Sequence, residues 1–136
     1  MPLSCAIPIS GGARTPGVRI EEPARLPAAL VALGLGDPRP VLVLVGGAAN
    51  LDPSVAGPLG RLFEALAPRL DRLGAAVIDG ATAYGVMELM GLARFRAGCQ
   101  FPLVGVAALG TVDIPGLGVD EPRGSAALDP NHSHFI

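Results

Sequence analysis

The segment Ala75-Ala-Val-Ile-Asp79-Gly-Ala-Thr-Ala-Tyr-Gly85-Val-Met-Glu-Leu-Met90 decides the fold. Its first residues are an aliphatic run that ends in aspartate, which is typical of a buried strand. Gly80 to Gly85 predicts a tight turn, and Val86 to Ala97 predicts a helix because apolar residues recur at helical spacing. A buried strand that turns through glycine into a helix is half of a βαβ unit, so this segment predicts a parallel sheet.

The same alternation continues on both sides of this segment. Val41 to Val45 and Pro102 to Ala107 are short aliphatic runs that predict two more buried strands. Pro58 to Leu73 carries one apolar helical stripe, and Pro68 is expected to kink or divide that helix. A further helix is expected from Pro23 to Leu33. Strict alternation of strands and helices predicts an α/β fold, Rossmann-like, with a doubly wound, mainly parallel sheet.

The N-terminal end of the chain shows little periodicity. Residues 1–22 contain the turn signals Ser10-Gly11-Gly12 and Thr15-Pro16-Gly17. We therefore expect an irregular segment in which only Val18 to Ile20 forms a short strand. The chain of 136 residues fits a single domain, 1–136, around one core.

The C-terminal part combines a long loop with an interrupted strand. Leu109 to Ala127 is rich in Gly, Pro and Asp, which predicts a binding loop or lid. His134-Phe135-Ile136 is typical of the start of a strand, so we expect that further C-terminal strands are missing from the chain. The apolar edge left there would be unpaired and would favour a homodimer.

Composition argues against several classes of protein. Half of the residues are apolar, the mean hydropathy is +0.50 and only 4% are aromatic, which fits an aliphatic sheet covered by helices. The net charge is −2 and the cations are not clustered, so no nucleic-acid partner is expected. No apolar run approaches the ~20 residues that span a bilayer, and the first residues lack the pattern of a signal peptide. We therefore expect a cytoplasmic domain without membrane insertion.

Candidate metal ligands are few. Cys5 and Cys99 lie far apart and outside any ligand pattern, which predicts two reduced, mostly buried thiols. His132 and His134 would share a face of a strand, but a metal site would need a third ligand, for which only Asp129 is near. We expect no metal and no cofactor. A ligand contact by the two histidines, or hydrogen bonding to the long loop, is the favoured interpretation.

The carboxyl ends of the three strands are the expected place for a ligand, as in other open α/β sheets. They carry Gly46-Gly47 and the turn Asp79 to Gly85, where glycine lets the backbone approach a ligand closely. Unpaired N–H groups and the dipole of the following helix favour an anion, for which phosphate is the natural candidate. The competing interpretation is that these glycines only form a tight connection, and glycine spacing alone does not decide between the two.

A family resemblance favours the first interpretation. Val77 to Gly91 resembles the motif (V/I)(V/I)DGGT-x-x-GVM-x-LMG of the SLOG superfamily, and more narrowly that of the prokaryotic "SLOG in TRPM" (LSDAT) domains. Val41 to Gly47 agrees with this, and Leu128-Asp-Pro-Asn-His-Ser-His-Phe135 is similar to the LEPNHTHF segment of the family. The three stretches follow the order of the family and span Val41 to Phe135.

The resemblance implies a Rossmannoid sensor domain that binds a nucleotide-derived small molecule and is coupled to an effector domain or protein. Relatives in melastatin-type TRP channels recognise ligands like ADP-ribose, so ADP-ribose, NAD-like molecules and cyclic nucleotides are the candidate ligands. Ala81 departs from the family, which usually has glycine there, and its Cβ is expected to narrow the approach to a phosphate. The expected ligand-binding residues are Gly46, Gly47, Asp79, Gly80, Ala81, Thr82, Tyr84, Gly85, Val86, Met87, His132 and His134.

An enzymatic alternative comes from the same superfamily. Its LOG-type members are nucleoside-monophosphate phosphoribohydrolases that use a PGGxGTxxE segment, and nothing in this chain matches that segment. Cleavage of an N-glycosidic bond would need a carboxylate near the turn, either Asp79 or Glu88. Asp79 is also expected to accept a ribose hydroxyl or to cap the turn, and Tyr84 to stack on a base or to pack. No catalytic residue is therefore assigned.

Overall fold

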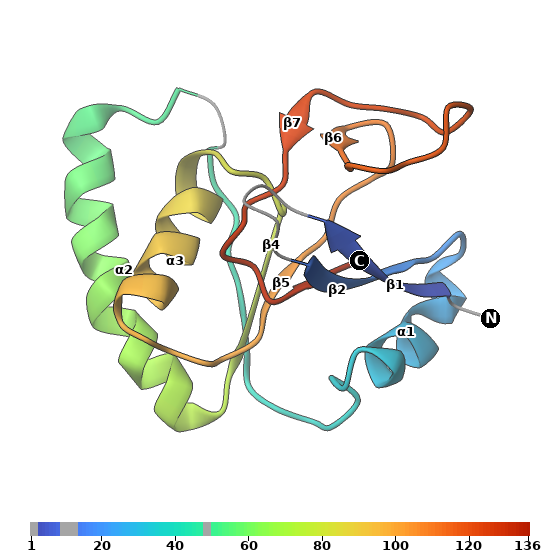
Figure 1. The fold of residues 1–136 in the computed structure, drawn as a ribbon. Coiled ribbons are helices and arrows are strands. Elements are labelled where there is room, and N and C mark those ends of the chain that lie inside the picture. The colour runs from blue at the N-terminus through green and yellow to red at the C-terminus, as the bar shows by residue number, and fades with distance from the viewer. Residues whose placement is uncertain (1–2, 9–13, 48–49) are drawn as a thin grey trace.

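The computed structural model describes residues 3–8, 14–47 and 50–136 of the chain, and its elements are shown in Figure 1. One sheet has six strands in the order β1-β2-β8-β5-β4-β3, and a second sheet pairs β6 with β7. The strands are β1 (Leu3–Pro8), β2 (Arg14–Arg19), β3 (Val41–Val43), β4 (Ala76–Asp79), β5 (Leu103–Gly105), β6 (Val112–Asp113), β7 (Ala126–Ala127) and β8 (His134–Phe135). The helices are η1 (Pro23–Arg25), α1 (Leu26–Ala32), α2 (Pro53–Leu73) and α3 (Gly85–Arg96).

The centre of the large sheet is parallel. β4 pairs with β3 on one side and with β5 on the other, and β5 pairs with β8, all in parallel. Parallel pairing of consecutive strands requires crossovers, and α2 and α3 provide the two between β3 and β5. The predicted α/β, Rossmann-like fold with a mainly parallel sheet is confirmed.

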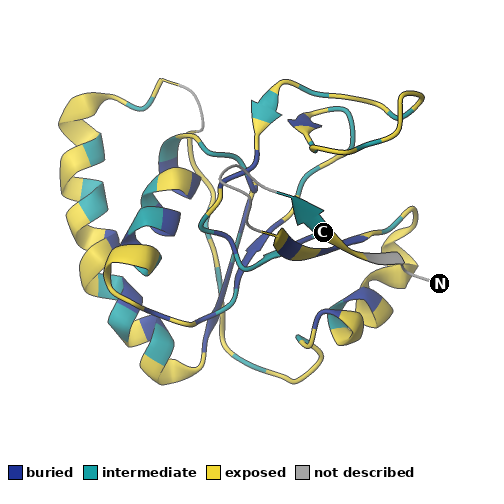
Figure 2. Cartoon of the chain, viewed as in Figure 1, coloured by how far each residue is buried: buried dark blue, intermediate teal, exposed yellow. Residues whose placement is uncertain are grey.

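The main core lies between this sheet and two helices. Figure 1 shows α2 and α3 on one face of the sheet and α1 on the other. The buried side chains of α2 and α3 pack on Val77 of β4 and Leu103 of β5, and Figure 2 shows the buried residues gathered along these inner surfaces. Cys99 is buried in this core, whereas Cys5 is exposed. The expectation of two buried thiols was therefore wrong for Cys5, which lies on β1.

Helix α2 is longer and more continuous than expected. It begins at Pro53, where Asp52 caps the first turn by accepting a hydrogen bond from the N–H of Ser54 at 2.8 Å. Pro58 and Pro68 both lie inside the helix, so the predicted start at Pro58 and the predicted division at Pro68 were wrong. Core contacts on both sides of Pro68 outweigh the lost backbone hydrogen bond.

Among the described residues, no helix combines the length and apolarity needed to cross a membrane.

The N-terminal segment is more ordered than expected. β1 and β2 form an antiparallel hairpin, and β2 also pairs in parallel with β8 through Gly17 and Phe135. The prediction of an irregular segment with one short strand was therefore wrong, and Thr15-Pro16-Gly17 lies inside β2. The other turn signal, Ser10-Gly11-Gly12, lies outside the described residues.

The strand predicted at the C-terminal end is present as β8. It lies between β5 and β2 and pairs with both. The expectation of an unpaired edge at this strand was wrong, because the N-terminal hairpin supplies a neighbour that local sequence patterns do not reveal. Leu109 to Ala127, expected as a loop, contains β6 and β7, which pair in parallel.

Gly105 marks a position in β5 where the sheet has no room for a side chain. A Cβ added there would lie 2.6 Å from Cβ and 2.8 Å from Cα of Ala81, and 2.9 Å from the ring of Phe135. We expect Gly105→Ala to lower the free energy of unfolding by about 1–3 kcal/mol, as overpacking does in other cores. Urea-induced unfolding measures this change. Gly118→Ala is the matched control, because a Cβ there makes only an ordinary contact of 3.7 Å with Glu121, and a similar loss in both variants would contradict the packing argument.

Candidate functional site

The turn between β4 and α3 is anchored to the segment that precedes β8. The N–H of Ala83 donates to the carbonyl of Ala127 at 2.9 Å, and the N–H of Asp129 donates to the carbonyl of Ala81 at 2.8 Å. These two bonds flank the isolated bridge between Thr82 and Leu128. The turn at the carboxyl end of β4 is therefore held by residues far along the chain rather than by its own glycines alone.

The end of β3 meets the start of α3. The N–H of Val86 donates to the carbonyl of Gly47 at 3.1 Å. A Cβ on Gly46 would lie 2.9 Å from a methyl carbon of Val86, so glycine permits this close approach. The structure thus brings Gly46 and Gly47 next to the first turn of α3, as the ligand hypothesis requires.

The backbone donors of the turn divide into two groups. Those of Ala81, Ala83 and Val86 are used internally, by Asp79, Ala127 and Gly47. The remaining ones donate to no acceptor within the part of the chain that the structure describes, and they belong to Gly80, Thr82, Tyr84, Gly85 and Met87. The start of α3 also has no side-chain cap. The expected cluster of free donors is therefore present in part, without Ala81, Ala83 and Val86.

Ala81 has an unusual backbone and a buried side chain. Its φ of 71° lies in the left-handed region that favours glycine. Its side chain is fully buried in a small cluster with Val112, Leu128 and Phe135. The methyl group therefore packs into the core, and the expectation that it narrows the approach to a phosphate was wrong.

A buried chain of three ionisable side chains lies beneath the turn. Nε2 of His132 is 2.6 Å from Oδ1 of Asp79, and Nδ1 of His132 is 2.8 Å from Oδ2 of Asp129. The exposed fractions of the side chains are 0% for His132 and Asp79 and 1% for Asp129. Oδ1 of Asp79 also accepts the N–H of Ala81 at 2.9 Å. Asp79 thus caps the turn, which was one of its two expected roles.

The pKa of His132, the histidine between the two buried aspartates, is raised. Burial lowers the pKa of His132, but hydrogen bonds and charge interactions with Asp129 and Asp79 outweigh burial, so its pKa is raised above the usual 6.5. Each carboxylate favours the imidazolium form, which can donate from both ring nitrogens at once. The ring also stacks on Phe135, with 5.6 Å between ring centroids.

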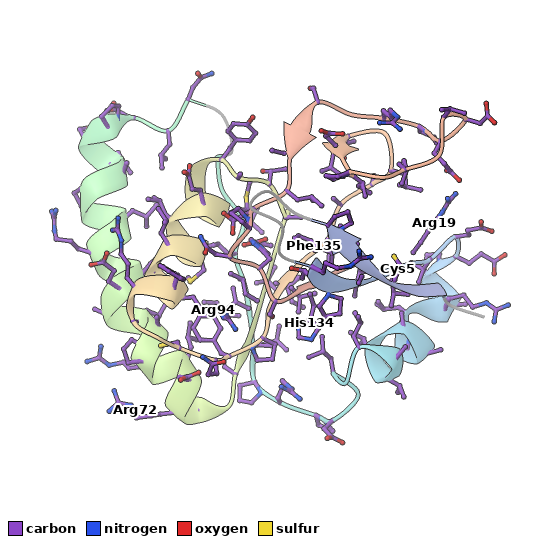
Figure 3. All side chains as sticks on the ribbon, in the orientation of Figure 1. Cys5, Arg19, Arg72, Arg94, His134 and Phe135 are labelled. Carbon is purple, nitrogen blue, oxygen red and sulfur yellow. The ribbon has the colours of Figure 1, made fainter. Side chains whose placement is uncertain are left out.

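The two histidines do not form a pair. His132 stacks on Phe135, whereas His134 is next in sequence to Phe135 on β8 and therefore points to the opposite face of the sheet. Nδ1 of His134 lies 2.8 Å from Oγ of Ser133, and burial together with the charge of Arg94 lowers its pKa. In Figure 3 the labelled Arg94 lies toward α3, whereas the labelled His134 lies toward α1 on the other side of the central strands. The expectation that the histidines share a face was wrong, because the strand begins only at His134.

Two buried side-chain oxygens near the turn have no hydrogen-bond partner among the described residues. They are Oδ2 of Asp79 and Oγ1 of Thr82. Unpaired buried oxygens are uncommon in folded proteins and call for an explanation such as a ligand, water or strain. Tyr84 is 45% exposed and Glu88 is exposed at the start of α3, so both side chains are accessible from solvent.

Sequence reasoning missed the role of Asp129, which it considered only as a metal ligand. The spacing of Asp129 and His132 allows their direct contact, and this was a signal that could have been used. Gly91 is a second missed residue, because a Cβ there would collide with the Asp129 carboxylate. Glycine in the middle of α3 therefore makes room for the buried chain.

Two cavities lie away from the turn. A groove of about 750 Å³ is lined by α1, the segment after it and the sheet face below it. A second cavity, of about 420 Å³, lies between the β1–β2 hairpin and the residues around β6. Both are mostly apolar, and residues 80–87 line neither. An anion needs hydrogen-bond donors rather than apolar walls, so the turn suits an anion better than either cavity does.

The family model described as "SLOG in TRPM, prokaryote" matches residues 39–136, which contain β3 to β8 and the whole turn between β4 and α3. No curated protein matches the chain.

Proposed function

The chain belongs to the family described as "SLOG in TRPM, prokaryote", and from this premise we propose that it is a sensor domain that binds a phosphate-containing, nucleotide-derived ligand. The ligand class is that of ADP-ribose, NAD-like molecules or cyclic nucleotides. In this proposal the domain is cytoplasmic and passes ligand occupancy to an effector. The effector stays a prediction from the sequence, whereas the homodimer was predicted from an edge at β8 that is paired in the structure.

One observation carries the proposal, namely the set of free N–H groups at the carboxyl end of β4. Gly80, Thr82 and Tyr84 lie in the turn, and Gly85 and Met87 open α3. These donors lie where the helix dipole adds positive potential, and together they suit the oxygens of a phosphate or pyrophosphate. Gly46 and Gly47 form the adjacent wall.

The side chains around these donors suit the rest of a nucleotide. Oγ1 of Thr82 lacks a partner among the described residues and is suited to a ribose hydroxyl. The half-exposed ring of Tyr84 is suited to stacking on a base. We leave His134 outside the site because it lies on the other face of the sheet from Asp79 and His132.

We do not extend the proposal to hydrolysis of a nucleotide. Asp79 is fully buried, and its Oδ1 already accepts hydrogen bonds from Ala81 and His132. Glu88 is exposed on α3, and no structural feature singles it out as the partner for a reacting sugar.

Calorimetric titration with ADP-ribose, NAD and cyclic AMP tests the proposed function. We expect at least one of them to bind, and to bind at least about tenfold more tightly than adenosine, which has no phosphate for the free donors. Adenosine is the matched control because it keeps the base and the ribose. Equal affinities for adenosine and for its phosphorylated relatives, or no binding at all, would contradict the proposal.

A further inference from the structure

We propose that His132 and Asp129 are positioning residues of the ligand site. Together with Asp79 they form a clamp, a set of hydrogen bonds that holds Ala81 in its left-handed conformation. The clamp thereby fixes the orientation of the free N–H groups that follow Ala81. The inference rests on the proposed function for its ligand. Its geometry depends only on the hydrogen bonds of the buried chain.

The clamp holds both sides of Ala81. Its N–H donates to Oδ1 of Asp79 at 2.9 Å, and its carbonyl accepts from the N–H of Asp129 at 2.8 Å. His132 contacts the carboxylates of both these aspartates. A non-glycine residue at a φ of 71° needs such external support, because this conformation is unfavourable for a side chain with a Cβ.

The carboxylates of Asp79 and Asp129 differ in how many hydrogen bonds hold them besides the one to His132. Oδ2 of Asp129 also accepts the N–H of Asn131 at 3.1 Å, so Asp129 is held without His132. The carboxylate of Asp79 has Ala81 and His132 as its partners among the described residues. Without His132, the carboxylate of Asp79 is therefore less firmly held than that of Asp129. The N–H of Ala81 then no longer has an acceptor in a fixed position.

Protonation of His132 strengthens the clamp. The charged groups that face the ring are Asp79 from β4 and Asp129 from the segment before β8, while β8 contributes the uncharged ring of Phe135. Because the pKa of His132 is raised, the contribution of the imidazolium is complete below pH 6.5 and is lost as the pH rises through the higher folded value. Deprotonation also adds net negative charge beneath the phosphate donors, which weakens anion binding in the same direction.

Two substitutions of His132 separate the effect of its hydrogen bond to Asp79 from the effect of losing the imidazole ring. Glutamine places its amide nitrogen near the position of Nε2 and can still donate to Asp79, whereas asparagine mimics Nδ1 and reaches only Asp129. With ADP-ribose as the probe, we expect His132→Asn to lose at least about tenfold in affinity and His132→Gln to lose less than about threefold. His134→Gln is the matched control and is expected to bind like the wild type, because it lies in the same segment on the other face.

Amide hydrogen exchange tests the clamp without any ligand. We expect the N–H of Ala81 to exchange at least about tenfold faster in His132→Asn than in His132→Gln. The N–H of Val77, which donates to the carbonyl of Pro102 at 2.8 Å, reports global opening and is expected to exchange alike in both variants. If ADP-ribose does not bind the wild type, the proposed function fails for this probe, while the exchange at Ala81 still decides whether the clamp exists.

The pH dependence of binding completes the test. The affinity of the wild type for ADP-ribose is expected to fall as the pH rises through the folded pKa of His132, which is raised above 6.5. The affinity of His132→Gln is expected to stay constant, since the pyrophosphate keeps its charge in this range. The inference is overturned if both His132 variants lose the same affinity for ADP-ribose. It is also overturned if amide exchange becomes faster to the same extent at Ala81 and Val77 in His132→Asn, or if the affinity of His132→Gln depends on pH as that of the wild type does.

Discussion

Replacing Asp79 with asparagine is expected to lower the free energy of unfolding by about 3 kcal/mol, the lower end of the range for removing one partner of a buried ion pair. The imidazolium of His132 would lose one of its two carboxylates in an environment that solvent does not reach. The loss stays at the lower end because Asp129 continues to compensate the charge. Urea-induced unfolding below pH 6.5, where His132 is protonated, measures the change.

A matched control shows whether burial causes the loss of stability in Asp79→Asn. Asp120→Asn makes the same chemical change at an exposed position and is expected to leave the free energy of unfolding within about 0.5 kcal/mol of the wild type. If Asp79→Asn also costs less than about 1 kcal/mol, its contact with His132 behaves like an exposed ion pair, and the buried chain has no special role in stability.

Replacing Gly85 with aspartate is expected to weaken ligand binding at least tenfold, or about 1.4 kcal/mol. The substitution puts a negative charge at the first residue of α3, next to the free N–H groups of Gly85 and Met87. It competes with the phosphate of the ligand for the same donors. Calorimetry with whichever phosphorylated nucleotide binds the wild type measures the effect.

The control for this variant is Gly85→Asn. Gly85 has a φ of 55°, a conformation that Asn and Asp tolerate better than other residues with a side chain. The two variants therefore share size and backbone strain and differ only in charge. Equal affinities of Gly85→Asp and Gly85→Asn would show that the start of α3 does not hold the phosphate.

Much of the fold followed from local patterns because the physics behind those patterns is local. A parallel strand is buried on both faces, so the aliphatic runs from Val41, Ala75 and Pro102 predicted β3, β4 and β5, although β3 and β5 are shorter than their runs. The Val41 run was predicted as a central, buried strand, and this was wrong, because β3 lies at the edge of the sheet with Val41 and Val43 exposed. The glycine-bearing turn after Asp79 predicted the change from strand to helix. The free donors at Gly85 and Met87 could also be anticipated, since every helix begins with unpaired N–H groups.

Other features could not be predicted because distant contacts override local preferences. Pro68 lies within a continuous α2 since the helix is buried against the sheet on both sides of it. Thr15-Pro16-Gly17 favours a turn, but pairing with β1 and β8 keeps it extended. Ala81 disfavours a left-handed backbone, yet hydrogen bonds to Asp79 and Asp129 hold it there.

The sequence by itself determined the alternating strands and helices, the place of the turn at the carboxyl end of β4 and the family to which the chain belongs. Only the tertiary structure decided that His132 lies beneath this turn, between Asp79 and Asp129, and that His134 does not. The physical reason is that Asp79 and His132 are 53 positions apart. Their contact depends on the order of β4, β5 and β8 in the sheet and on where β8 begins, which no periodicity within a single segment encodes.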